Sequence, residues 1–323
     1  MNNFPSSVRI NEEGPREGFQ IEPALIPTSA KIELIDALSE TGLKQIQVVS
    51  FVNPKRVPGM ADADQVVAGF KPKEGVRYTS LWLNEQGFLR AAASKRLSLT
   101  GRIVLSASEA FLNRNQNSSS QKNIDDHRAM MPVYAAHGVA VEHGGLQSAF
   151  GCNFQGEIPV ETVLKAAADV FSIAEEFSQK LKTFVLADTM AWATPETVKR
   201  VVGAIRNRYP DIDVILHLHD TRGMAIANAY AGLQMGVRQY DAAIAGLGGC
   251  PFAQHKGASG NVCTEDLVFM CEELGIDTAI DLEALIEAAN MAERVVGHPV
   301  PGSVMKGGSL KKYRAARLGQ RAS

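Results

Sequence analysis

The sequence contains no apolar run long enough to cross a bilayer, so we expect no membrane-spanning helix. Cysteine is scarce, with 4 in 323 residues and no CxxC pair, which predicts reduced thiols rather than a disulfide framework. Charge of either sign is not in excess, because the formal net charge is -2 at pH 7. We therefore expect neither nucleic acid nor a membrane as a partner. Residues 1–5 lack the basic and apolar regions of a secretory signal, and we expect a cytoplasmic protein.

Strand-like apolar segments alternate with segments of helical periodicity along most of the chain. Strands are expected at residues 8–12, 46–52, 77–83, 102–106, 138–144, 184–188, 213–219 and 240–245. Helices are expected from Thr28 (as the cap) to Gly42 and at residues 61–69, 86–97, 124–137, 159–181, from 194, and at 223–235, with a polar loop over 113–123. No GxGxxG follows the first strand, which disfavours a doubly wound nucleotide-binding sheet. Eight strands in this alternation predict an α/β fold, a (β/α)8 TIM barrel.

Two further helices, expected at residues 264–274 and 281–296, would cover one side of the barrel. We expect one domain over residues 1–298, formed by the barrel and its covering helices. Residues 299–323 are rich in Gly, Ser, Lys and Arg. They are expected to form a C-terminal tail that is mobile or lies at a subunit contact.

His217 and His219 lie two residues apart at the end of the seventh expected strand. Side chains alternate along a strand, so both imidazoles are expected on one face. Two neutral imidazoles on one face make half of a metal site. A hydrogen-bonded pair of histidines in the barrel core is the alternative interpretation.

Polar residues at the other strand ends could complete such a site, because barrel chemistry occurs at the carboxyl ends of the strands. The glycine-rich turn at residues 14–18 supplies Arg16 and Glu17, and the last loop supplies Asn261. Glu17, His217, His219 and Asn261 form a mixed oxygen and nitrogen set that suits Mg²⁺ or Mn²⁺, with Zn²⁺ or Co²⁺ as alternatives. Asp220 is a candidate for orienting a ligand imidazole. Each carboxylate alone is more typical of a helix cap or a surface charge.

Cys250 lies in a glycine-rich loop, Gly246–Gly249 and Gly257–Gly260, where the backbone can approach a ligand closely. A thiol there can act as an acid or a nucleophile when its pKa is tuned. A free cysteine that simply packs as a small apolar side chain is the alternative.

Four motifs together resemble the 3-hydroxy-3-methylglutaryl-CoA lyase family of the DRE-TIM metallolyase superfamily, which also includes isopropylmalate and homocitrate synthases. They are Gly14-Pro15-Arg16-Glu17-Gly18, Ser50-Phe51-Val52-Asn53-Pro54-Lys55, His217-Leu218-His219-Asp220-Thr221, and Gly246-Leu247-Gly248-Gly249-Cys250-Pro251 with Gly257-Ala258-Ser259-Gly260-Asn261. The similarity runs from about Val8 to Val296. It implies a (β/α)8 barrel that cleaves a 3-hydroxyacyl-CoA into acetyl-CoA and a keto acid, with a small-molecule acyl-CoA as substrate and a homodimer or higher homo-oligomer as the assembly.

The resemblance also implies residue roles. Arg16, His217 and Cys250 would be catalytic, with Arg16 stabilising the enolate oxygen and Cys250 assisting proton transfer. Glu17, His217, His219 and Asn261 would bind the divalent ion. Side chains that contact the substrate or support the ligands would be Gln20, Gln47, Trp82, His143, Asp188 and Asp220.

Several positions depart from the pattern of the lyases. Glu17 stands where the family has aspartate, Gln47 stands where it has an active-site glutamate, and Trp82 and His143 occupy strand ends where it has other residues. These departures keep three hypotheses open. The chain is a lyase for a 3-hydroxy-3-methylglutaryl-CoA-like thioester, or a related lyase, aldolase or Claisen-type enzyme for another branched hydroxy acid such as a citramalyl-CoA-like compound, or a non-catalytic binding barrel.

Overall fold

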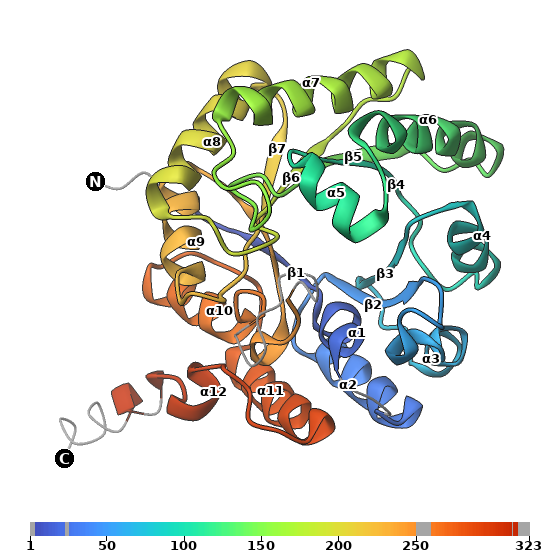
Figure 1. The fold of residues 1–323 in the computed structure, drawn as a ribbon. Helices are drawn as coiled ribbons and strands as arrows, with labels where there is room; N and C mark the ends of the chain where they lie inside the picture. The colour runs from blue at the N-terminus through green and yellow to red at the C-terminus, as the bar shows by residue number, and fades with distance from the viewer. Residues whose placement is uncertain (1–3, 23–25, 250–259, 312, 316–323) are drawn as a thin grey trace.

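The computed structural model describes residues 4–22, 26–249, 260–311 and 313–315. Its eight strands are β1 Arg9–Glu12, β2 Gln45–Phe51, β3 Arg77–Trp82, β4 Gly101–Ser106, β5 Val141–Gln147, β6 Thr183–Ala187, β7 Asp213–His217 and β8 Gln239–Ala242. They form one parallel sheet in the order β3-β2-β1-β8-β7-β6-β5-β4. Figure 1 shows these strands at the centre of the molecule with the helices around them. The predicted (β/α)8 barrel with extra C-terminal helices is confirmed.

The helices are mostly crossovers between consecutive strands, as a parallel sheet requires. They are α1 Phe19–Ile21, α2 Thr28–Glu40, α3 Ala63–Gly69, α4 Glu85–Ala93, α5 Glu109–Gln116, α6 Ser120–Ala136, α7 Val160–Glu176, α8 Pro195–Arg208, α9 Ala225–Gln234, α10 Thr264–Glu273, α11 Leu282–Val296 and α12 Val304–Gly307, with short helical turns η1 Gly14–Gly18, η2 Pro58–Met60 and η3 Ile244–Gly246. None of the helices in the described part of the chain is long and apolar enough to cross a membrane.

The barrel wall has a seam between β3 and β4, which stand at opposite ends of the strand order and do not pair. The side chain of Arg102 in β4 crosses this seam. Its guanidinium donates a hydrogen bond to the carbonyl oxygen of Ser80 at 3.1 Å and lies over the Trp82 ring, 5.0 Å from its centroid. Side-chain contacts thus replace backbone pairing at this one join.

The register of the central strands places polar side chains in one row inside the barrel. Asp241 of β8 is opposite Asn11 of β1 on one side and opposite His217 of β7 on the other. Residues opposite one another in neighbouring strands project to the same face of the sheet. The row therefore brings groups from the first and last strands of the chain together beneath the carboxyl ends of the barrel.

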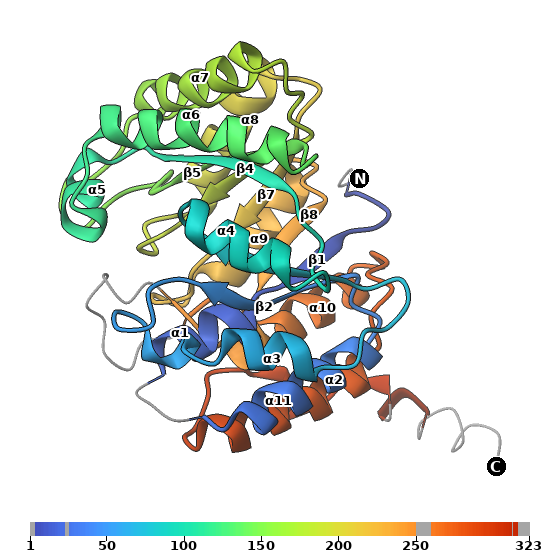
Figure 2. The same cartoon turned by 90° about the vertical axis from the view of Figure 1, so that its right-hand side faces the viewer.

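The two helices after the barrel, α10 and α11, are confirmed at the expected positions. Figure 2 shows α11 beside α2 along the lower edge of the barrel, and the two helices are in contact. The first residues of the expected tail also pack here, because Val300, Val304 and Met305 are buried. The boundary at residue 298 remains a prediction.

The polar segment 113–123, expected as a loop, is mostly helical. It contains the end of α5 and the start of α6. Asn117 ends α5 in the left-handed conformation with φ 50°, and the side chain of Ser119 accepts a hydrogen bond from the backbone N–H of Lys122 to cap α6. The prediction was wrong because these polar residues are helix caps rather than solvated loop residues.

Two helices end earlier than their periodicity predicts. α4 ends at Ala93 and α7 at Glu176, rather than at residues 97 and 181. Lys95 and Ser178 follow them with φ of 52° and 54°, and a left-handed residue cannot continue an α-helix. Apolar residues beyond these points pack on the core without being helical.

The start of α2 and the position of the fifth strand also differ from expectation. Thr28 is the first helical residue after Pro27 rather than the cap, and its hydroxyl donates to Asp62 at 2.8 Å. β5 begins at Val141 and not at residue 138, because Gly138 has φ 65° and the N–H of Val139 still bonds to the end of α6. Residues 138–140 therefore belong to the turn, and the strand runs three residues further than predicted.

Candidate metal centre

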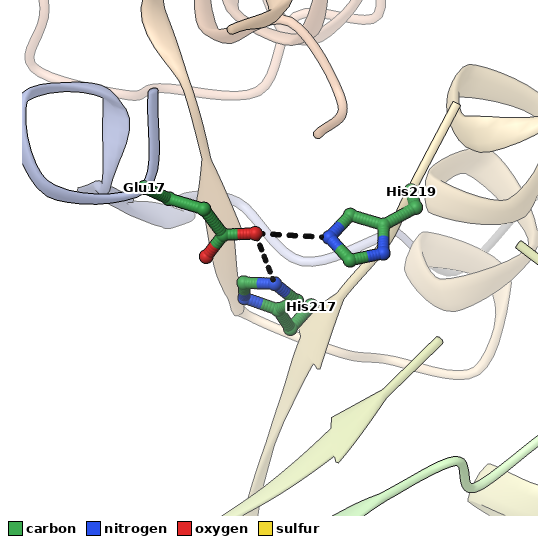
Figure 3. Close-up of side chains that lie close together, drawn as sticks. All are labelled: Glu17, His217 and His219. Atoms are coloured by element: carbon green, nitrogen blue, oxygen red, sulfur yellow. Dashed lines mark hydrogen bonds and ion pairs between the residues drawn. The ribbon is translucent and has the colours of Figure 1, made fainter. Parts of the chain in front are cut away.

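Glu17, His217 and His219 meet at the carboxyl ends of β1 and β7 (Figure 3). Oxygen Oε1 of Glu17 lies 3.1 Å from Nε2 of His219 and 3.7 Å from Nε2 of His217. The two imidazole centroids are 5.1 Å apart. The expectation that both rings project to one face, and that Glu17 joins them, is confirmed.

The outer nitrogen of each imidazole is held by an acceptor. Nδ1 of His219 donates to the carbonyl oxygen of Thr189 at 3.0 Å, and Nδ1 of His217 donates to a carboxylate oxygen of Asp241 at 3.2 Å. These bonds place an N–H on Nδ1 of both rings and direct Nε2 of each ring at Glu17. A proton or a metal ion between Nε2 and the carboxylate stabilises this arrangement.

The electrostatics of the three side chains favour positive charge at this point. Burial would lower the pKa of His217, but the Glu17 carboxylate and the hydrogen bond to Asp241 raise it to about 10. Burial would raise the pKa of Glu17, but Arg16 and then His217 hold it well below its usual range. A proton and a metal ion are alternative cations at Nε2 of His217, because both are stabilised by the nearby carboxylates. Metal binding is therefore expected to release a proton.

Asn261 adds an amide oxygen beside the cluster. It pairs with His219 through an isolated β-bridge, and its Nδ2 donates to the carbonyl of Leu247 at 3.2 Å. Its Oδ1 is buried and makes no hydrogen bond, which is costly for an amide oxygen unless a ligand satisfies it. A side chain on Gly248, which has φ 88°, would come within 2.5 Å of the Asn261 amide and 2.9 Å of Glu17. Glycine at this position lets the two side chains approach.

The predicted tight turn at residues 14–18 is one turn of π-helix, η1, and it carries both Arg16 and Glu17. Glu12 fixes its start. This buried carboxyl accepts hydrogen bonds from the N–H of Gly14 at 2.7 Å, the N–H of Ile244 at 2.8 Å and the hydroxyl of Thr264 at 2.6 Å. Burial raises the pKa of Glu12 to about 8 despite these donors. The turn that presents Glu17 is thus tied to the end of β8.

Arg16 lies beside the metal cluster, and its guanidinium contacts three side chains. Nη1 is 2.8 Å from Oε2 of Glu17, Nη2 pairs with Glu13 at 2.5 Å, and Nε donates to Oε1 of Gln47 at 2.5 Å. Gln47, expected at the site, is therefore one of its neighbours. A buried cation adjacent to the metal ligands is suited to stabilise an oxyanion.

Three other expected site residues lie close by but do not touch the metal cluster through the contacts that we observe. Gln20 accepts a hydrogen bond from the buried hydroxyl of Ser50 at 3.2 Å. Asp188 accepts from the N–H groups of Trp192 and Ala193, and so shapes the turn that carries Thr189. Asp220 accepts from the N–H of Ala225 at the start of α9. The orienting role expected for Asp220 is filled instead by the Thr189 carbonyl.

His143 and Trp82 make contacts away from the metal cluster, where contact with the substrate was expected of them. His143 is near the start of β5, where Nδ1 contacts the hydroxyl of Thr183 at 2.5 Å, and burial with nearby Arg102 lowers its pKa to about 4. Trp82 is 4% exposed, and its Nε1 donates to the hydroxyl of Tyr134 at 2.9 Å in the layer between β3 and α6. Both positions follow from strand geometry, because β5 runs further than predicted and Trp82 points toward the helices.

Cys250 lies outside the described residues. Its role in proton transfer remains a prediction.

Sequence reasoning missed two acidic residues and one amide at the centre, Glu13, Asp241 and Asn11. Asp241 accepts from Nδ2 of Asn11 at 2.9 Å through one oxygen and holds His217 through the other. A carboxylate in the eighth strand, followed by the apolar residues Ala242–Ala245, was the available signal. The two-residue alternation from Asn11 to Glu13 was another, since both face the barrel interior.

We expect Asp241→Asn to weaken Mn²⁺ binding by about 10- to 100-fold, because it removes the carboxylate that holds the His217 ring. Isothermal titration calorimetry measures the change. The matched control is Asp64→Asn, which alters an exposed ion pair with Arg90 far from the ligands in sequence. Equal affinity in Asp241→Asn and the native protein would show that His217 needs no such support.

The donors present fit a divalent cation. Two imidazole nitrogens and one carboxylate oxygen converge from η1 and the end of β7, and the Asn261 side chain lies next to Glu17 across Gly248. The buried Asn261 oxygen without a partner is the observation that distinguishes this set from a simple hydrogen-bonded histidine pair. Mixed oxygen and nitrogen ligation suits Mg²⁺, Mn²⁺ and other first-row divalent ions.

A (β/α)8 barrel with such a candidate metal centre at the carboxyl ends of its strands belongs to the class of barrels that carry enzyme active sites there. Within that class, the chain belongs to the HMGL-like family, whose model matches residues 7–292.

Relatives of known activity extend over nearly the whole chain. Mitochondrial hydroxymethylglutaryl-CoA lyase of Mus musculus is 40% identical over 293 residues, which is 90% of this chain and 86% of the mouse protein. Hydroxymethylglutaryl-CoA lyase YngG of Bacillus subtilis is 37% identical and covers 92% of this chain and 96% of its own length. The structure of an HMG-CoA lyase from Acinetobacter baumannii in complex with coenzyme A and 3-methylmalate superposes with a TM-score of 0.84, with 36% identity and coverage of 96% and 98% of the two chains.

Proposed function

We propose that the protein is a divalent-metal-dependent carbon–carbon lyase that cleaves a 3-hydroxy-3-methylglutaryl-CoA-like thioester to acetyl-CoA and acetoacetate. The observation that carries this proposal is the convergence of Glu17, His217 and His219 beside the buried guanidinium of Arg16, with the unpartnered oxygen of Asn261 on a side chain next to Glu17. Membership of the HMGL-like family and the similarity to hydroxymethylglutaryl-CoA lyases support it.

Cleavage of such a thioester breaks the bond between the hydroxyl-bearing carbon and the methylene next to the thioester carbonyl. The electron pair moves onto the acetyl-CoA fragment as an enolate, the hydroxyl loses its proton to become the ketone of acetoacetate, and a proton is returned to the enolate carbon. A bound divalent ion supplies Lewis-acid polarisation of substrate oxygen. Glu17, His217, His219 and Asn261 would hold that ion.

The chain's own groups account for the charge changes in this reaction. Arg16 offers a fixed guanidinium for the enolate oxygen, and because it is already held by Gln47 and two carboxylates it need not reorganise as charge develops. The Nδ1 bonds of His217 and His219 keep both rings oriented. Cys250 is proposed to return the proton to the enolate carbon.

The binding of coenzyme A is proposed from the same relatives, among them the A. baumannii lyase in complex with coenzyme A and 3-methylmalate. A related lyase for another branched hydroxy acid is the second candidate. Glu17, which is one methylene longer than aspartate, and the neutral Gln47 beside Arg16 favour it because both alter the space and charge around the acyl group.

Release of acetyl-CoA from 3-hydroxy-3-methylglutaryl-CoA, with Mg²⁺ or Mn²⁺ and with EDTA, tests the proposal. We expect turnover with metal and its loss with chelator. A panel that includes citramalyl-CoA separates the two candidates, since turnover of only that compound would replace the first with the second. Metal binding without cleavage of any thioester in the panel would contradict both.

A further inference from the structure

The guanidinium of Arg16 is surrounded by three partners, one for each nitrogen. Glu17 accepts from Nη1, Glu13 from Nη2 and Gln47 from Nε. The side chain of Arg16 is 12% exposed and that of Glu13 is 5% exposed, so water does not replace these contacts. The direction of the guanidinium is therefore set by the protein.

Glu13 and Gln47 are also bonded to each other. Nε2 of Gln47 donates to Oε1 of Glu13 at 3.1 Å while its Oε1 accepts from Arg16. Arg16, Glu13 and Gln47 thus form a closed ring of hydrogen bonds, which we call the Arg16 ring. Gln47 is neutral, so Glu13 is the one acidic side chain within the Arg16 ring.

The position of Glu13 has a consequence for the metal ligand. Glu17 contacts Arg16 through Oε2 and the imidazoles through Oε1, so the guanidinium and a bound metal compete for the charge of the same carboxylate. Glu13 precedes η1 and offers Nη2 of Arg16 a second carboxylate, separate from the Glu17 oxygen that contacts the imidazoles. Removing Glu13 would leave Glu17 as the only carboxylate, among the described residues, in direct contact with the guanidinium.

We propose that Glu13 is the positioning residue for Arg16, and that it acts through the Arg16 ring to keep the guanidinium aimed at the reacting oxygen and to leave Glu17 available to the metal. The effect on turnover rests on the proposed lyase function. The effect on metal binding does not.

Charge relocation tests the proposal. The variants are Glu13→Gln, Gln47→Glu and the double variant E13Q/Q47E, which moves the carboxylate from one side of the Arg16 ring to the other and keeps the same groups. Glu40→Gln is the matched control, because Glu40 is 70% exposed in an ion pair with Lys73. Each protein is assayed for kcat and KM, and its Mn²⁺ affinity is measured by calorimetry. The Mn²⁺ titrations are repeated in an Arg16→Met background.

We expect Glu13→Gln to lower kcat by about 10- to 100-fold with KM nearly unchanged, because the guanidinium loses its fixed direction. Its Mn²⁺ dissociation constant should rise by about 3- to 10-fold, which is the size of effect that groups supporting a ligand produce. The double variant should recover most of both losses. In the Arg16→Met background, Glu13→Gln should change Mn²⁺ affinity much less, whereas a general charge effect would be the same in both backgrounds.

Native kcat and Mn²⁺ affinity in Glu13→Gln would overturn the proposal, as would a double variant no better than Glu13→Gln. If Glu13→Gln does not fold by circular dichroism, Gln47→Leu takes its place. Gln47→Leu breaks the Arg16 ring but keeps the charged side chains of Arg16 and Glu13. An unchanged kcat in that variant would also count against the proposal. A native protein without lyase activity would contradict the proposed function, and the Mn²⁺ titrations would still decide the role of Glu13.

Discussion

Replacing His219 with alanine is expected to weaken Mn²⁺ binding by at least about 100-fold and to abolish most metal-dependent turnover, because a ligand nitrogen is lost. Nε2 of His219 makes the shorter of the two imidazole contacts with Glu17, and the ring is 4% exposed. Its tautomer is fixed by the Thr189 carbonyl. The β-bridge between His219 and Asn261 is a backbone contact that alanine retains, so the loss of affinity reports on the imidazole itself.

Calorimetry with Mn²⁺ and metal content after dialysis measure this loss. The matched control is His137→Ala, since His137 is an exposed histidine at the end of α6 whose Nδ1 contacts a backbone carbonyl. We expect that control to bind metal as the native protein does. Full Mn²⁺ affinity in His219→Ala, with a native circular dichroism spectrum, would show that the histidines are a hydrogen-bonded pair and not ligands.

Replacing Arg16 with methionine is expected to lower kcat by about 1000-fold, the upper end of what removing one oxyanion-stabilising donor causes. Mn²⁺ affinity should stay the same or increase, because Nη1 of Arg16 no longer competes for Glu17. A fall in kcat without a fall in Mn²⁺ affinity distinguishes a catalytic guanidinium from one that only supports the fold. Steady-state kinetics and calorimetry on one preparation provide both numbers.

Arg128→Met is the control for that substitution, because Arg128 forms a surface ion pair with Glu176 and is 39% exposed. Exposed pairs of this kind contribute little to stability. A kcat in Arg16→Met within a few-fold of the native value would remove Arg16 from the reaction. A parallel fall in kcat and metal affinity would instead indicate that Arg16 maintains the site as a whole.

The barrel and the core of the metal centre follow from the sequence because they depend on short-range periodicity. Alternation within a strand placed His217 and His219 on one face, and the alternation of strands and helices placed their strand end beside the turn with Glu17. Such patterns are local in the chain. The carboxyl ends of parallel strands then meet by topology alone.

The supporting contacts do not follow from the sequence, because they depend on which way each strand faces. Trp82 was expected near the substrate. The residue before it in β3 faces the barrel interior instead, and its indole is bonded to Tyr134 of α6. Asp220 is next to His219 in the chain, yet the group that holds the ring is Thr189, 30 residues away. Glu13 and Asp241 were missed for the same reason, since their partners come from other strands.

The candidate metal ligands are far apart in the chain, with a sequence separation of 202 between Glu17 and His219. β1 and β8 lie side by side, so the first strand to leave the ribosome pairs with the last. A nascent chain holds Glu17 early but has no partner for it until the segment through Asn261 has been synthesised. Contacts of such long sequence separation form late in folding. Metal capture by this cluster therefore requires synthesis through Asn261, and a product that terminates before that residue carries an incomplete set of candidate ligands.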